Sequence, residues 1–431
     1  MTPNKKLVLN GLFAAIFFST INEIFTYVVT GTAIGKVVSM ADELYTIFLL
    51  FYTYVVTGKL KHVKILWAAV VFSICGLLGN VLNHTTIMVA IMGLFNTMKP
   101  VIVFYCLCQY DFEWRDFYGL MKKFTYFFPV IAISYVLDLF FPMFRISIGL
   151  FDLEYRAGIR SLGGLFVKQT NGILWALVYY IFYKYYAVRK HKLYYYISIV
   201  AIFMSLKVKD ILGFCVAYFF TLFKKVRVKY LFIGAPVMIA LFVGYMTLMP
   251  EHYAEYFESD GDDSNVARVA LNVTSLKIGI DHIPFGVGFG QFGSPTSRDY
   301  DSNVYSNYGI DMVYGLTNRE GDPNYMCDTF WPMILGETGI LGVAAYLWLL
   351  FVSFGPFLKR FINNTHDINI LFPCFLFIYF LTATIGKPML VGPPHSFVLW
   401  GLAGLFYSLC TGSSLLPNVL YIQNGRKFVI K

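Results

Sequence analysis

Three glycines in the stretch PFGVGFGQFG, Gly288, Gly290 and Gly293, have the spacing G-x-G-x-x-G. This spacing is typical of the turn that binds a dinucleotide, provided that a buried strand precedes it and a helix follows. The preceding residues are Ile-Asp-His-Ile-Pro, and the following SPTSRDYDSNVYSNYG is not expected to form a helix. We therefore reject a nucleotide site. Instead, we expect a tight turn whose backbone N–H groups approach a ligand or a membrane surface.

Arginine and lysine side chains indicate a different chemistry. A planar guanidinium binds phosphate oxygens through paired hydrogen bonds, and a lysine adds a point charge. Several cations fall in segments that the topology below places on the outer side of a membrane or at its boundary: Arg145, Arg156, Arg160, Lys207, Lys209, Arg268 and Arg298. Ionisable groups at membrane depth need a partner, and an anionic ligand such as a lipid-linked pyrophosphate would neutralise several of them. The alternative is structural ion pairing with Asp152, Glu154, Asp210 or Asp281.

A reaction at such a pyrophosphate site also needs a general base, a group that removes the proton of an attacking hydroxyl. A carboxylate at the membrane boundary suits this role, and Asp328 is the first candidate. Asp281, His282 and Glu337 are further candidates. Asp328 has a structural alternative as the cap of the helix that follows it, because Asp directly before Thr-Phe-Trp-Pro suits that position. Glu337 could equally be the buried partner of a cation.

The elements that must position these groups are membrane helices. Of the 431 residues, 58% are hydrophobic and only 14% are charged, whereas a soluble domain carries about 25% charged residues. Many apolar blocks approach the length that crosses a bilayer. We predict an all-α polytopic membrane protein that forms one domain over residues 1–431. Its twelve predicted spans are 8–29, 41–57, 65–82, 86–108, 124–143, 171–187, 193–206, 210–223, 230–249, 329–353, 368–386 and 396–412.

The distribution of basic residues orients these spans. Clusters such as Lys5/Lys6, Lys59/Lys61, Lys224/Lys225 and Lys359/Arg360 all fall on one side of the twelve-span arrangement. By the positive-inside rule this side is the cytoplasm, and both termini lie there. The net charge of +9 is therefore explained by topology and does not indicate nucleic-acid binding.

Two long segments, 144–170 and 250–327, then lie on the outer side. The second is rich in residues that stack on sugar rings or bond to hydroxyls, among them Tyr300, Asn303 and Tyr305. An ordinary solvated loop is the alternative. The seven cysteines and seven histidines form no C-x-x-C or H-x-x-H pair, so we expect neither a metal site nor another cofactor.

Four stretches together resemble the superfamily of O-antigen polymerases (Wzy-type) and O-antigen ligases. They are RSLGGLFVKQTN at 160–171, the turn at 205–210, the outer stretch at 264–294, and DTFWPMILGETGILG at 328–342. The resemblance covers roughly residues 125–355. Each motif alone is weak, and their order and spacing carry the likeness.

The resemblance implies a GT-C-like glycosyltransferase at the outer face of the bacterial cytoplasmic membrane. Because the sequence shows no metal-ligand cluster, we expect it to work without metal. A polymerase of this superfamily transfers a growing glycan from undecaprenyl pyrophosphate onto the next lipid-linked repeat. A ligase transfers it onto lipid A core. The ligase signature is His-Asn, nine residues and G-x-x-G, and here Asp328 stands in place of the His, which favours the polymerase.

For such a polymerase we expect Arg160, Arg268 and Asp328 to be catalytic. The predicted substrate-binding residues are Arg156, Lys207, Lys209, Asp281, His282, Tyr305 and Glu337. A flippase and a chain-length regulator would be partners in building an O-antigen or a capsule. A lipid-linked-oligosaccharide flippase is the alternative from another class, although such transporters commonly show internal repeats, and none is evident here.

Overall fold

A computed structural model describes residues 4–28, 38–57, 60–141, 143–147, 155–156, 158–186, 191–227, 230, 247, 267–316, 325–411, 420–423 and 426–429. In these ranges the chain is mostly helical. The longer helices are α1 (Lys5–Val28), α3 (Ala41–Thr57), α4 (Val63–Leu82), α5 (Ile87–Leu107), α6 (Trp114–Phe140), α8 (Gln169–Tyr185), α9 (Lys192–Met204), α10 (Val208–Thr221), α13 (Ala267–Asp281), α16 (Trp331–Asn363), α17 (Ile368–Ala383) and α18 (His395–Thr411).

The helices overlap the predicted spans, although α6 begins ten residues earlier and α16 ends ten residues later than predicted. Each predicted span has such a helix except 230–249, which lies almost entirely outside the described residues. Among the described helices, α4, α5, α6 and α16 are long and apolar enough to cross a membrane. The fold is mostly helical, as predicted, and two small antiparallel hairpins accompany the helices. They pair β1 (Tyr155–Arg156) with β2 (Ile159–Arg160), and β3 (Leu420–Gln423) with β4 (Arg426–Val429).

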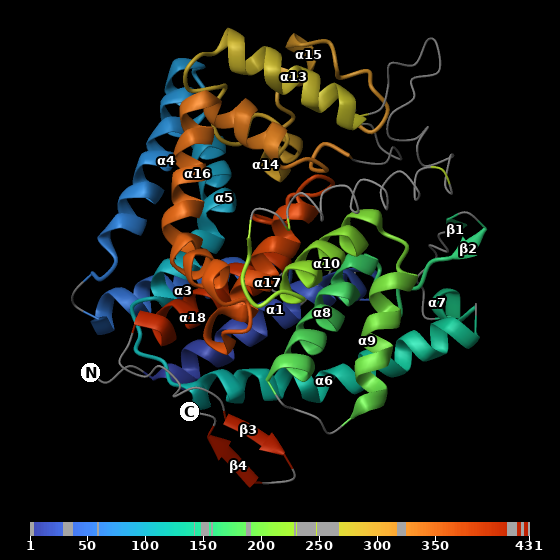
Figure 1. Cartoon of the computed structure of the whole chain (residues 1–431). Coiled ribbons are helices and arrows are strands. Elements are labelled where there is room, and N and C mark those ends of the chain that lie inside the picture. Colours follow the sequence, from blue (N-terminus) through green and yellow to red (C-terminus); the bar gives the residue numbers. More distant parts are fainter. Residues whose placement is uncertain are drawn as a thin grey trace.

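The helices form two groups around a common core. In Figure 1, α4, α5 and α16 run side by side on the left, and α8, α9 and α10 stand on the right. Helix α17 lies between the groups and packs on α10 and α18, and α18 packs on α5. The interface of α3 and α5 holds charge as well: Lys99 Nζ lies 2.5 Å from Glu43 Oε1 and also contacts Asp42. These side chains are neutralised within the bundle.

Helix α16 is interrupted at Gly339, the ninth of its 33 residues. Gly339 has φ 64° and ψ −170°, and a Cβ atom at this position would lie 2.3 Å from the carbonyl oxygen of Pro284. Only glycine accepts both this backbone region and this close approach. The break therefore lets the chain at 284–288 pack directly against the helix backbone, with Val287 N and Gly288 N donating to Gly336 O and Glu337 O at 2.9 Å.

The second outer segment contains more helix than expected. Besides α13, two short helices follow the glycine turn, α14 (Pro295–Asp299) and α15 (Val304–Asn307). The prediction of no helix in this stretch was therefore wrong. Ser294 caps α14 by accepting a hydrogen bond from Ser297 N at 3.2 Å, and Pro295 occupies the first turn. A Ser-Pro start with a second Ser three residues later is a capping signal that the sequence already carried.

Candidate functional site

Two of the three predicted catalytic residues contact each other. Arg268, in the first turn of α13, donates from Nη2 to Asp328 Oδ2 at 2.6 Å, across 60 residues of sequence. The side chains are 24% and 21% exposed, so the pair is reachable from solvent while most of its surface is covered. Asp328 lies in the turn before α16, whose N-cap is Phe330 with no side-chain cap bond. The helix-cap alternative for Asp328 is therefore wrong, and its carboxylate faces Arg268 instead.

Further cations surround this pair. Lys209, in the first turn of α10, interacts electrostatically with Arg268, Asp328 and Lys387. Lys387 lies in the α17–α18 connection beside Gly386, where an added Cβ would lie 3.1 Å from Lys209 Cδ. We call Lys209, Arg268, Asp328 and Lys387 the basic cluster. Its four residues come from four separate stretches of the chain.

The turn between α9 and α10 fixes the position of Lys209. Ser205 ends α9 by donating to Ile202 O at 2.7 Å, and Leu206 takes a left-handed conformation with φ 52°. Lys207 is the N-cap residue of α10, and its backbone N–H donates to Ser205 Oγ at 3.4 Å. The chain at 205–210 thus forms a tight turn between two helices. It leaves Lys209 on the first turn, at the end of α10 that faces the basic cluster.

Two buried groups extend the polar surroundings of the cluster. Asp210 is fully buried and accepts from Tyr379 Oη at 2.7 Å, and its second oxygen, Oδ2, has no hydrogen-bond partner. His395, at the start of α18, is buried, interacts electrostatically with Lys209 and Lys387, and contacts Thr170 O at 3.2 Å. A buried carboxylate oxygen without a partner is costly unless a cation or a ligand approaches it. Lys209, which interacts electrostatically with Asp210, is the nearest such cation in sequence.

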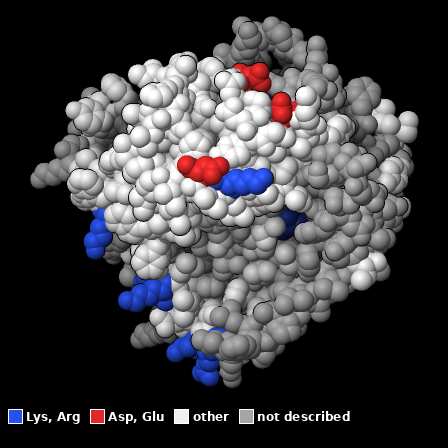
Figure 2. All heavy atoms as spheres, turned by 90° about the horizontal axis from the view of Figure 1, so that it is seen from above, with Lys and Arg blue, Asp and Glu red and all other residues white. Residues whose placement is uncertain are grey.

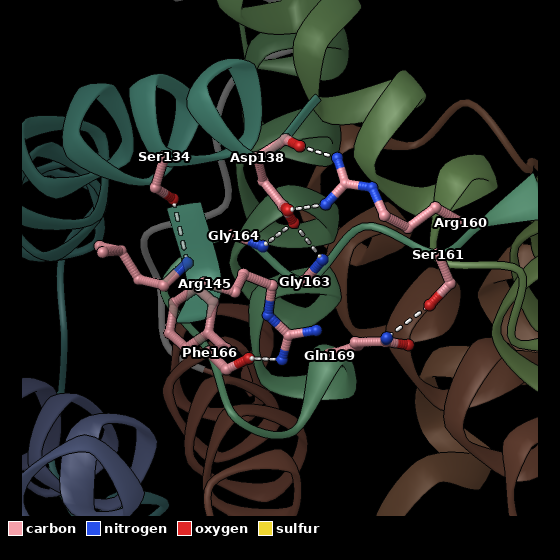
Figure 3. Close-up of polar contacts among 10 residues, drawn as sticks. Ser134, Asp138, Arg145, Arg160, Ser161, Gly163, Gly164, Phe166 and Gln169 are labelled. Carbon is pink, nitrogen blue, oxygen red and sulfur yellow. Dashed lines mark hydrogen bonds and ion pairs between the residues drawn. The ribbon is translucent and has the colours of Figure 1, made fainter. Parts of the chain in front are cut away.

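The third predicted catalytic residue, Arg160, binds Asp138 (Figure 3). Its Nη1 donates to Asp138 Oδ1 at 2.6 Å, and its Nη2 donates to the backbone oxygen of Asp138 on α6. The other oxygen of this buried carboxylate accepts from Gly163 N and Gly164 N, each at 2.9 Å. Asp138 therefore ties the loop after β2 to α6, and Arg160 balances its charge. None of the acidic partners considered from the sequence is the observed one.

Arg145 occupies the same region and is also held by protein atoms. It is 1% exposed, and its Nη2 donates to Phe166 O at 3.1 Å and Val167 O at 3.3 Å. Gln169, beside it in Figure 3, donates to Ser161 Oγ. These bonds shape the entry to α8. The chain at 160–169 is thus an ordered, mostly buried loop that bonds to α6 and to the last residue of α9.

The glycine turn binds protein rather than a ligand. Glu337 Oε1 accepts from Gly290 N at 2.9 Å and from Phe292 N at 3.4 Å, and Asn80 Oδ1 accepts from Phe289 N at 2.9 Å. Glu337 is 1% exposed. The expectation that these N–H groups approach a ligand or a membrane is therefore wrong, and so is the expectation of a cation as the partner of Glu337. The carboxylate acts as an internal anchor for the turn.

Tyr305 supports the same turn. It is buried, and its hydroxyl accepts from Gly293 N at 2.9 Å and lies 3.1 Å from Ser297 Oγ. Burial raises the pKa of Tyr305 above its usual value, so the phenol stays protonated. A neighbour of Asp328, Cys327, has its pKa raised to about 12 by burial, and its thiol is therefore a poor nucleophile at neutral pH.

The remaining predicted residues lie away from the basic cluster. Asp281 ends α13, so the helix rise of about 1.5 Å per residue separates it from Arg268 by about 20 Å. It accepts from Tyr308 Oη at 3.0 Å, and burial raises the pKa of Tyr308 to about 12. His282 follows directly, and its backbone oxygen accepts from Phe285 N and Gly286 N. Arg156 pairs with Ile159 in the β1–β2 hairpin, where only its backbone is described.

The cysteines and acidic residues of the described ranges form no group that could hold a metal ion. All seven cysteines are free. No family model matches the chain, and no curated protein matches its sequence. The site thus has to be interpreted from its own chemistry.

Sequence reasoning missed three residues that organise this region. Lys387 stands in the stretch Gly-Lys-Pro between two apolar helices, and this lone cation at a predicted span end was an available signal. Asp138 and Asn80 lie within apolar stretches as isolated polar residues. Their partners are 22 and 209 residues away in sequence, and nothing local indicates such pairings.

Proposed function

We propose that this protein is a polysaccharide polymerase that transfers a glycan from undecaprenyl pyrophosphate onto the next lipid-linked repeat. The observation that carries the proposal is the basic cluster. Arg268, Asp328 and Lys209 come from three of the four stretches that resemble the polymerase superfamily, and they meet at the ends of apolar helices. Lys387 adds a cation from a fourth part of the chain.

The charge of the cluster matches the leaving group. In the proposed step, the hydroxyl oxygen of the acceptor sugar attacks the anomeric carbon of the donor glycan. The bond from that carbon to the pyrophosphate oxygen breaks, and its electron pair leaves with undecaprenyl pyrophosphate. Cations that are already in place stabilise the charge that develops on that oxygen. Lys209, Lys387 and Arg268 are the residues proposed for this role.

Asp328 would receive the proton of the acceptor hydroxyl. In the ligand-free protein its carboxylate is occupied by Arg268 at 2.6 Å. A bound pyrophosphate offers the guanidinium a doubly hydrogen-bonding partner of higher charge. Arg268 would then turn toward the phosphate, and the Asp328 carboxylate would become free to act as a base. The resting ion pair thus couples base activation to binding of the donor.

Arg160 takes a different place in this proposal. Its bonds to Asp138 support a structural role in shaping the loop at 160–169, so the direct contacts to pyrophosphate are assigned to the basic cluster. We place the cluster at the outer face of a bacterial cytoplasmic membrane, with a flippase as supplier of repeats and a chain-length regulator as a further partner. The product would be an O-antigen, a capsule or another repeat-unit polysaccharide.

The proposal is tested by complementing a strain that lacks the chain with single variants and resolving its surface glycan by gel electrophoresis. Arg268→Lys, Lys387→Gln and Asp328→Asn should each reduce elongation by about 100-fold or more, as removal of one preorganised donor does elsewhere. The glycan should shrink to a single repeat. Lys277→Gln, on the exposed face of the same helix as Arg268, is the matched control and should leave chain length unchanged.

The amount of each variant in the membrane is measured in parallel. Normal chain length in abundant Arg268→Lys and Lys387→Gln variants would exclude the basic cluster as the active site. Long polymer left on the lipid carrier would instead indicate a ligase. If no repeats reached the outer face, a flippase would be indicated.

A further inference from the structure

Helix α13 has two apolar faces, and only one of them packs against the protein. The buried face faces α16 and the glycine turn, and it consists of Ala267, Leu271, Thr274, Ser275 and Ile278. The other face is formed by Val269, Val273, Leu276 and Ile280, and Ile283 follows just beyond the helix. These positions are spaced by four, three, four and three residues, which places them in one line along a helix. We call them the outer stripe of α13.

The outer stripe is strongly exposed. Leu276 is 60%, Ile280 is 73% and Ile283 is 65% accessible. Single exposed apolar residues are ordinary, but a continuous line of them marks a surface that contacts another apolar phase. Figure 2 looks onto the end of the molecule where α13 lies, and its described part is mainly uncharged with a few charged side chains.

The stripe continues into the apolar surface of a helix that can cross a membrane. At its end, Pro284 O accepts from Leu341 N of α16 at 3.3 Å. Ile340 and Leu341 are themselves 57% and 47% exposed. Within α13, Gly279 permits close packing against α16, since an added Cβ would lie 3.2 Å from Leu335 Cδ1. The outer stripe and the exposed side of α16 therefore form one apolar surface.

We propose that α13 lies in the interfacial layer of the bilayer, with its outer stripe in contact with the acyl chains of membrane lipid. In Figure 1, α13 crosses over the ends of α4, α5 and α16 rather than running beside them, as an interfacial helix does. Lys277 is exposed between Leu276 and Ile280, and its long side chain can extend its charge to the lipid headgroups. This inference stands on the surface of α13 and does not depend on the proposed reaction.

A second copy of the chain is the main competing occupant. A stable protein interface buries roughly 800 Å² on each partner in a two-dimensional patch. The outer stripe is a single row of side chains, which offers too narrow a contact for that purpose. Lipid acyl chains can cover a single row of apolar side chains, and the exposed apolar side of α16 already requires lipid beside it.

The test uses a nitroxide spin label on Leu276→Cys in the full chain, reconstituted into nanodiscs of phosphatidylethanolamine and phosphatidylglycerol. Asn307→Cys, on the exposed side of α15, is the matched control in the same outer segment. The unsubstituted protein, treated identically, gives the background from the native cysteines. Collision rates with oxygen, which partitions into lipid, and with a water-soluble nickel complex are measured at both positions. Thermal unfolding of both variants confirms that they are folded.

We expect the ratio of oxygen to nickel collisions to be several-fold higher at position 276 than at position 307. Equal ratios with free access of the nickel complex would place the stripe in water and overturn the proposal. Low access of both reagents at position 276 would also overturn it, because that outcome indicates a covering protein surface such as a second copy.

Discussion

Arg160 and Arg268 carry the same guanidinium group but differ in what holds them. Arg160 forms two bonds to one residue, Asp138, whose carboxylate is fully buried and bound on its other side by two backbone N–H groups. Arg268 contacts a carboxylate that is 21% exposed, in the neighbourhood of Lys209 and Lys387. The first arrangement neutralises charge inside the fold. The second places a partly exposed ion pair beside two lysines.

This difference predicts opposite outcomes for one conservative change. Arg160→Lys keeps the charge beside Asp138 and loses one hydrogen bond, so stability should fall by about 1 kcal/mol while glycan length stays normal. Arg268→Lys should keep stability and lose elongation. Thermal unfolding and glycan length are measured on both variants. A stable, abundant Arg160→Lys protein that makes no polymer would contradict the structural role and indicate that Arg160 acts in the reaction.

Substitution of Asp138 tests the structural role of its ion pair with Arg160 through the stability of the protein. Asp138→Ala leaves Arg160, 12% exposed, without its counter-charge and leaves two backbone N–H groups without an acceptor. Removing one partner of a buried ion pair costs about 3–5 kcal/mol. We expect Asp138→Ala to lower membrane abundance and unfolding temperature sharply, and Asp138→Asn, which keeps an acceptor oxygen, to do so less. Equal unfolding temperatures for Asp138→Ala and the unsubstituted protein would contradict this role.

At the scale of elements, the glycine turn acts as a connector between helices. Its N–H groups are bound by Asn80 of α4 and Glu337 of α16, and its backbone reaches α5 at Gly93, where an added Cβ would lie 2.4 Å from Gly290 N. The turn therefore fixes the ends of three helices relative to α13. Because α13 carries Arg268, the geometry of the basic cluster depends on this connection.

Two glycines allow backbone strain to be separated from packing. Gly288 has φ 99°, and an added Cβ would lie 2.5 Å from Asn80 N, whereas Gly309 has φ 67° and open space around the added atom. Gly309→Ala should cost about 1–2 kcal/mol of backbone strain alone. Gly288→Ala should cost clearly more, because the helix backbone of α4 has to move. Unfolding temperatures in detergent measure both, and similar losses would show that the turn is not closely packed against α4.

At the scale of the whole molecule, hydrogen bonds and ion pairs join the segments that charge assigns to one side of the membrane. Lys5 Nζ lies 3.8 Å from Glu113 Oε1, and Lys61 Nζ lies 3.1 Å from Asp111 Oδ1, which places these chain segments near one another. Likewise, Val226 N donates to Ile362 O at 2.9 Å. These contacts agree with a common side for the basic clusters.

The orientation of the molecule is the corresponding prediction. A reporter fused near residue 226 should report the cytoplasm, and one fused near residue 275 should report the outer face, because Lys and Arg accumulate around 224–229. A pair of reporters, one active only outside and one active only inside, measures both positions. If residue 275 were cytoplasmic, Arg268 and Asp328 would face a compartment in which the proposed reaction does not occur.

The sequence by itself determined the class of fold and the chemistry to look for. Apolar blocks that approach the length of a membrane crossing predict membrane helices, because an unbonded backbone in lipid is costly and a helix satisfies its own N–H and C=O groups. The positions of the helices could therefore be predicted closely. The sequence also identified Arg268, Asp328 and Lys209 as candidate site residues, since charged groups beside apolar helices need partners.

Only the tertiary structure decided which of these groups meet. Arg268 and Asp328 are 60 residues apart, and Asn80 bonds to a turn 209 residues away. No periodicity of the chain encodes such distances, because they follow from how whole helices pack. The same packing pairs Arg160 with Asp138 and brings Lys387 beside Lys209. It also makes the G-x-G-x-x-G turn a connector between helices. Local pattern fixes which groups need partners, and the packing of distant helices selects the partner.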